Sequence, residues 1–123
     1  MPMLWAGWIY VALIMVLVGF QACMALGAPW GHLANGGRWR GRLPPAMRVA
    51  AIGQGAILVF MGTAMAARAG IAPDWPNWTF WAAFSVTIAT TVANLATPSR
   101  AERLLWGPVT VALTVCALRL AFC

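Results

Sequence analysis

Four long apolar stretches, separated by shorter polar segments, fill most of this 123-residue chain. They run over Leu4 to Leu26, Val49 to Ala67, Trp78 to Ala96 and Leu104 to Phe122. A helix rises about 1.5 Å per residue, so roughly 20 residues cross a hydrocarbon core of about 30 Å. The pattern therefore predicts four transmembrane helices over about 4–26, 49–67, 78–96 and 100–122.

The predicted fold class is all-α, an integral membrane four-helix bundle that forms a single domain over residues 1–123. Helices satisfy their own backbone hydrogen bonds, as the lipid interior requires. Composition supports this class, because 63% of the residues are hydrophobic and only 8% are charged. Such a chain has too little polar surface to cover a soluble globule.

The charged residues predict the orientation. The net charge of +6 comes from eight arginines against Asp74 and Glu102. Six of the arginines lie in or beside the first and third connections, namely Arg38, Arg40, Arg42, Arg48, Arg100 and Arg103. Only Arg68 and Arg119 lie on the other side, so the positive-inside rule places both termini in the periplasm of a bacterial inner membrane. The basic residues flank spans and form no separate basic domain, which argues against nucleic-acid binding.

The first connection, residues 27–47, combines tryptophan with arginine. Gly36-Gly37 and Pro44-Pro45 exclude a continuous helix there. Indole and guanidinium groups both favour the headgroup region, so we expect this cytoplasmic loop to lie on anionic lipid. Its alternative role is a docking site for a partner protein or an anionic ligand. The candidate contact residues are His32, Arg38, Trp39, Arg40, Arg42 and Arg48.

Two features are predicted for the last helix. Ser99 and Glu102 have the spacing of a capping box, which would start this helix at Arg100. Pro108 cannot donate to the carbonyl of Leu104, so a kink is expected near it.

Polar residues within the spans are few and are amides or hydroxyls: Gln21, Gln54, Thr87, Thr91 and Asn94. The last three are spaced i, i+4 and i+7, which places them on one helix face. An amide facing lipid would cost several kcal/mol, so we expect these groups to point into the bundle. One interpretation is polar bonding between helices. The other is that Gln21, Gln54 and Asn94, at similar depth, line a cavity open to the cytoplasm.

Residue types that would carry chemistry are scarce. The chain has one histidine, no CxxC pair among Cys23, Cys116 and Cys123, and no Ser/His/Asp set or paired carboxylates within a span. No span holds an acid or a histidine well inside, as an ion-coupled pump would need. We therefore predict no catalytic, metal-binding or cofactor-binding residues, and no enzyme.

The stretches ALGAPWGHLANGG, RLPPAMR and NLATPSRAERLLWGPV carry a resemblance that covers most of the chain. They are similar to small four-span inner-membrane proteins of high-GC bacteria. The resemblance implies the membrane architecture and no activity.

Three functional hypotheses remain. The first is a non-enzymatic membrane protein that acts through helix–helix, lipid or partner-protein contacts, using the arginine/tryptophan loop and the small residues Ala51, Gly55 and Gly62 of the second span. The second is a small homodimeric transporter or channel with a polar cavity open to the cytoplasm. The third is an enzyme subunit with a cofactor between chains. We expect anionic lipid and either a second copy or a protein partner as the binding partners.

Overall fold

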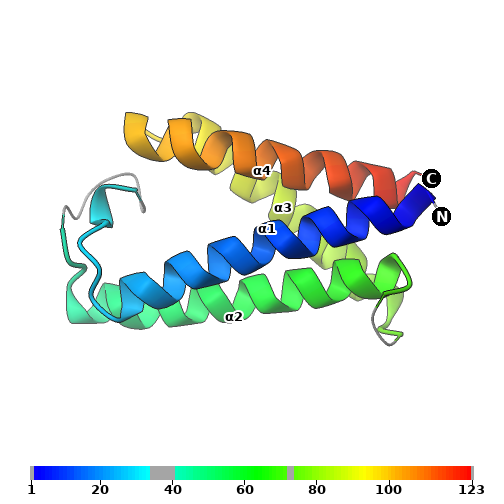
Figure 1. The fold of residues 1–123 in the computed structure, drawn as a ribbon, viewed down its shortest axis with the longest axis horizontal. Helices are drawn as coiled ribbons and strands as arrows, with labels where there is room; N and C mark the ends of the chain where they lie inside the picture. Colours follow the sequence, from blue (N-terminus) through cyan, green and yellow to red (C-terminus); the bar gives the residue numbers. More distant parts are fainter. Residues whose placement is uncertain (1, 34–40, 72–73, 123) are drawn as a thin grey trace.

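The computed structural model describes residues 2–33, 41–71 and 74–122, and these residues are helical with short connections (Figure 1). The helices, in chain order, are α1 (Pro2–Ala25), the 3-10 turn η1 (Gly31–Leu33), α2 (Pro45–Arg68), α3 (Asn77–Ala96) and α4 (Arg100–Ala121). Each of the four α-helices is long and apolar enough to cross a membrane. The prediction of an all-helical chain with four span-length helices is confirmed.

Glycine and proline set the helix ends. After α1, Gly27 has φ +103° and its N–H bonds to the carbonyl of Met24, while the N–H of Ala28 bonds to that of Cys23. Gly70, with φ +84°, ends α2 by the same pair of bonds, a Schellman motif that needs a left-handed residue. Pro45 is the first residue of α2, which begins four residues before the predicted Val49 because proline suits the first helical position.

The expected cap of α4 is present. The Ser99 hydroxyl accepts a hydrogen bond from the Glu102 N–H at 3.2 Å, and the helix begins at Arg100. α4 then continues through Pro108 to Ala121. Next to Pro108, the Thr110 hydroxyl lies within hydrogen-bond distance of two backbone carbonyls of the preceding turn. These are the carbonyls of Trp106, at 2.8 Å, and Gly107, at 3.0 Å.

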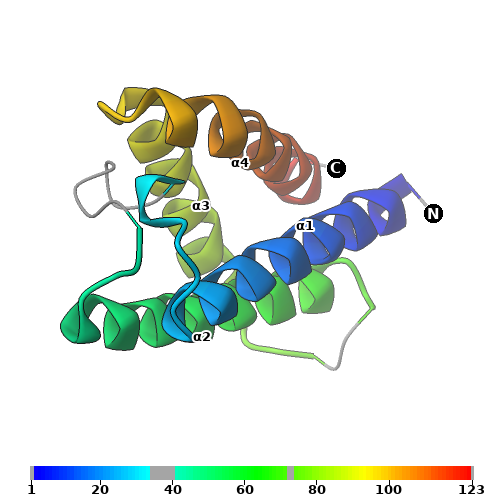
Figure 2. The same cartoon turned by 60° about the vertical axis from the view of Figure 1, so that its left-hand side comes forward.

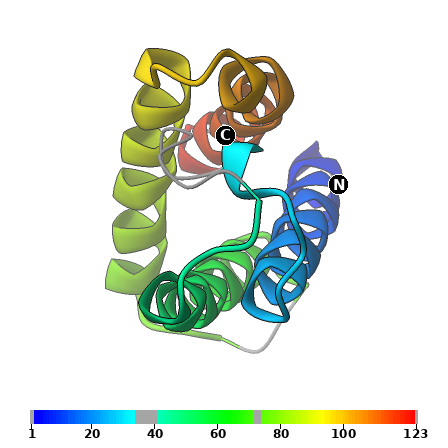
Figure 3. The ribbon, with the colours of Figure 1, turned by 90° about the vertical axis from the view of Figure 1, so that its left-hand side faces the viewer.

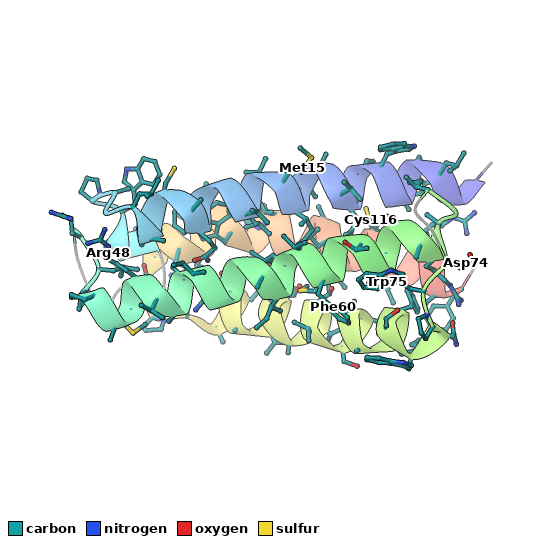
Figure 4. All side chains as sticks on the ribbon, turned by 90° about the horizontal axis from the view of Figure 1, so that it is seen from below. Met15, Arg48, Phe60, Asp74, Trp75 and Cys116 are labelled. Carbon is teal, nitrogen blue, oxygen red and sulfur yellow. The ribbon has the colours of Figure 1, made fainter. Side chains whose placement is uncertain are left out.

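The helices form two antiparallel hairpins, α1 with α2 and α3 with α4 (Figure 2). The hairpins meet at the end that carries both termini, which we call the termini end (Figure 1). At the opposite end, α2 begins far from the end of α3, and α1 ends far from the start of α4 (Figure 3). We call this the arginine end, because Arg42, Arg48, Arg100 and Arg103 lie in or beside its connections. Figure 4 shows Arg48 and Asp74 at opposite ends of the molecule.

The main core lies towards the termini end and in the middle of the bundle. It includes Tyr10, Met65, Ala117 and Leu120, all fully or almost fully buried. A close backbone approach supports it, since a Cβ on Gly7 would lie 2.5 Å from the Cβ of Ala69. The start of α1 and the end of α2 are therefore tightly packed within their hairpin.

Two of the small residues of the second span that the sequence offered for helix–helix contacts, Gly55 and Gly62, face α1 of the same chain. A Cβ on Gly62 would lie 3.1 Å from Ile14, and one on Gly55 would lie 3.8 Å from Gln21. Large apolar side chains are instead exposed on the outer faces of all four helices; Met15, for example, is 68% exposed and points away from the bundle (Figure 4).

Candidate functional site

A cavity of about 560 Å³ lies between the two hairpins, in the half of the bundle next to the arginine end. Its volume is in the range of pockets that hold small molecules. All four helices contribute to its wall, which is mostly apolar. The lining residues are Leu17, Phe20, Gln21, Leu33, Gln54, Ile57, Leu58, Met61, Val86, Thr90, Ala93, Asn94, Thr97, Pro98, Glu102, Trp106 and Thr110.

An aromatic group closes the cavity on the side between α1 and α4. The ring of Phe20 contacts that of Trp106 edge-on, with centroids 4.8 Å apart, and stacks with Trp30 at 6.1 Å. The Trp106 indole N–H donates to the carbonyl of Leu33 in η1 at 2.9 Å. Trp106 is only 8% exposed. The structure thus places Trp106 inside the bundle, where it joins η1 to α4.

The opposite side of the cavity, between α2 and α3, has apolar residues at its edge. Ile57 and Val86 both line the cavity and are 52% and 37% exposed. α2 and α3 are joined at the termini end, where Phe60 contacts Trp75 at 5.7 Å and Trp78 at 6.4 Å between ring centroids. The edge of the cavity between α2 and α3 is therefore formed by partly exposed apolar side chains.

The structure brings Gln21, Gln54 and Asn94 together on this cavity wall. The Asn94 amide N–H donates to the carbonyl of Thr90 in its own helix at 2.8 Å. Within the described part of the chain, none of these three amides hydrogen-bonds to another helix. Their remaining donors and acceptors are available to a molecule in the cavity.

Thr87 and Thr91 have a different place and join helices. The Thr87 hydroxyl lies 2.7 Å from the Tyr10 hydroxyl of α1, and both residues are buried. Thr91 contacts α4 twice, through the hydroxyl of Thr114 at 2.6 Å and the carbonyl of Thr110 at 2.9 Å. Hydroxyls thus supply the polar bonding between helices, while the amides line the cavity. Sequence reasoning did not single out Tyr10, whose partner lies 77 positions away.

Glu102 is the second residue that sequence reasoning missed as part of a site. It lies in the first turn of α4, is 8% exposed, and lines the cavity with Trp106 and Thr110. Of the described residues in the cavity wall, it is the one that can carry a charge. Its place in a capping box gave it a structural explanation, so only the three-dimensional structure shows that it lines the cavity.

The candidate residues of the first connection are only partly described. Arg38, Trp39 and Arg40 lie outside the described residues, and His32 belongs to η1. The Arg48 Nε donates to the carbonyl of Ala25 at 2.8 Å, which ties the start of α2 to the end of α1. Arg42 is exposed, and its guanidinium lies so close to Gly27 that a Cβ there would be 2.8 Å from it.

At the termini end, Arg68 holds three helices together. Its Nε donates to the carbonyl of Leu120 in α4 at 3.2 Å, and its Nη1 donates to the Asn77 Oδ1 at 3.0 Å. Its guanidinium carbon also lies 4.5 Å from the ring centroid of Phe80. A smaller hollow of about 200 Å³ adjoins it. These contacts make Arg68 a structural residue of this end.

No known protein family model matches the chain, and neither a curated protein nor a solved structure does so. Among the described residues, no group of three or more histidine, cysteine or acidic side chains could hold a metal ion.

Proposed function

We propose that this chain is a multi-pass protein of the bacterial inner membrane that binds a small amphipathic molecule in the cavity between its hairpins, without catalysing a reaction on it. The observation that carries the proposal is the cavity of about 560 Å³, with apolar walls and three amides that have no partner in another helix among the described residues. Pockets that bind small ligands combine apolar walls with a few polar groups in this way.

The exposed apolar side chains and the arginines support the membrane setting. Met15, Ile52 and Val92 are 60% or more exposed, which suits contact with lipid and would be unfavourable in water. The arginine end faces the cytoplasm by the positive-inside rule, so both termini lie in the periplasm. The cavity then opens towards the cytoplasmic half of the bilayer, and the exposed guanidinium groups contact anionic headgroups around it.

Transport is the second candidate function, and the shape of the bundle favours it. The hairpins are joined at the termini end by Tyr10, Thr87 and Arg68 and diverge at the arginine end. A cavity closed on one side and wide on the other is one half of an alternating-access cycle. All four helices of one chain build this cavity, so a second copy is not needed to form it. Flux of the identified ligand in proteoliposomes separates transport from binding alone.

Filling the cavity tests the proposal. We expect Ala93→Trp to place an indole in the cavity wall and to remove the bound molecule. Ala56→Trp is the matched control, because Ala56 is exposed on α2 on the face away from Gln54 and Leu58. The measurement is mass spectrometry of small molecules that copurify with each variant from the native membrane in a mild detergent.

The expected result is one molecule or lipid species enriched with the wild type and with Ala56→Trp, and reduced at least tenfold with Ala93→Trp. Equal enrichment in all three proteins, with equal elution from a sizing column, contradicts a ligand in this cavity.

A further inference from the structure

We propose that the ligand of this cavity is a lipophilic organic cation and that Glu102 is its counter-ion. This inference rests on the proposed function and names the chemical class of the ligand. Glu102 is an acidic residue in a cavity wall whose other described residues are apolar or neutral and polar.

The carboxyl group of Glu102 has a favourable place at the start of α4. It lies in the first turn of α4, where the free backbone N–H groups and the helix dipole favour a negative charge. The Ser99 hydroxyl binds the Glu102 N–H and fixes the start of this turn. A carboxylate that is only 8% exposed in such a cavity loses much of its hydration, and a bound cation restores favourable electrostatics.

The nearest arginine in sequence, Arg103, binds a backbone carbonyl and does not itself line the cavity. The Nη1 of Arg103 donates to the carbonyl of Thr97 at 2.9 Å, and the side chain is exposed. Arg100 is exposed as well, and Arg48 binds the carbonyl of Ala25 on the other hairpin. Within the described residues, no arginine belongs to the cavity wall, so Glu102 sets the sign of charge that the wall can accept.

The aromatic side of the cavity suits the same ligand. Phe20 and Trp106 both line the cavity and contact each other edge to face, so their rings are held in fixed positions. Aromatic faces attract organic cations, and tryptophan does so most strongly. The amides of Gln21 and Asn94 offer carbonyl oxygens to a positive group.

The apolar side chains in the rest of the cavity wall favour an organic cation over a metal cation. Calcium or magnesium ions require six or more oxygen ligands or bound waters. Leu17, Leu58, Met61 and Val86 instead present hydrocarbon to the cavity. A cation that carries its own apolar groups matches both the carboxylate and these walls.

The experiment uses two probes of nearly equal shape and opposite charge, tetraphenylphosphonium and tetraphenylborate. Binding of each radiolabelled ion to the purified full-length protein in detergent is measured by equilibrium dialysis, with empty micelles as the blank. We expect saturable binding of the cation, at least tenfold tighter than that of the anion. Equal or tighter binding of the anion overturns the assignment, and this comparison needs no variant.

Variants then test Glu102 itself. We expect Glu102→Gln to weaken cation binding at least tenfold, and Glu102→Asp to retain part of the affinity. Asp74→Asn removes the only other acid of the chain, at the far end of the molecule, and should bind as the wild type does. Unchanged cation binding by Glu102→Gln, eluting as the wild type does on a sizing column, contradicts the role of Glu102.

The same assay separates this inference from the proposed function. If the anion binds tightly and Ala93→Trp abolishes that binding, the cavity is a ligand site but the charge assignment is wrong. If neither ion binds saturably, the assignment of a lipophilic cation is wrong, and the copurification experiment alone decides whether the cavity holds another ligand.

Discussion

At the residue scale, two kinds of polar side chain have separate places in the bundle. Hydroxyl groups of Tyr10, Thr87 and Thr91 make the bonds between helices, where each group has a buried partner. The amides of Gln21 and Gln54 line the cavity. An unpaired amide in an apolar interior costs free energy, so these amides are stable only beside water or a ligand. These amides therefore favour the cavity as a ligand-binding site.

Gly7 offers a test of the packing at the termini end. We expect Gly7→Ala to lower the thermal unfolding midpoint, because the new Cβ would lie 2.5 Å from the Cβ of Ala69, an atom on a rigid backbone. Overpacking of this kind costs about 1–3 kcal/mol. Gly53→Ala is the matched control, since its Cβ would meet nothing within 4 Å. Circular dichroism scans at one heating rate give the comparison, and equal midpoints for the two variants would contradict this close approach.

At the element scale, the positions of the helices along the chain could be predicted from the sequence. The divergence of the two hairpins at the arginine end could not. Hydropathy and the Ser99 cap predict where helices lie, because each acts over a short stretch of the sequence. The divergence of the hairpins depends on contacts such as Trp106 with Leu33, which are 73 positions apart. The similar depth of Gln21, Gln54 and Asn94 could be predicted from their places in the spans. The position of Glu102 in the same cavity could not, because its local pattern already explained it as a cap.

Arg68 tests how the hairpins are joined. We expect Arg68→Ala to destabilise the bundle by about 1–3 kcal/mol, because it removes two charged hydrogen bonds and the contact with Phe80. Arg68→Lys should be intermediate, since an ammonium group cannot reproduce the fork of the guanidinium group. Arg119→Ala, which removes a charge near the end of α4, controls for net charge. Thermal unfolding in one detergent measures all three, and an Arg68→Ala midpoint equal to that of Arg119→Ala would contradict this role.

At the scale of the whole molecule, the bundle is asymmetric along its length. The termini end is packed and joined by Arg68, whereas the arginine end has the cavity beside it and carries, among the described residues, Arg42, Arg48, Arg100 and Arg103. On the basis of the positive-inside rule, we propose that the end with the cavity faces the cytoplasm. Binding, and transport if it occurs, would therefore begin from the cytoplasm or from the inner leaflet.

The proposed function depends most on a cavity that contains water and opens to the cytoplasm. Single cysteines placed in a variant without Cys23, Cys116 and Cys123 measure this directly, because maleimides react with thiols in water and not with thiols in lipid. A membrane-impermeant maleimide is applied to inside-out and to right-side-out vesicles that carry Asn94→Cys in the cavity wall or Val92→Cys on the exposed face nearby. We predict labelling of Asn94→Cys in inside-out vesicles only, and no labelling of Val92→Cys in either. An unreactive Asn94→Cys, or one labelled from the periplasmic side, would contradict the account.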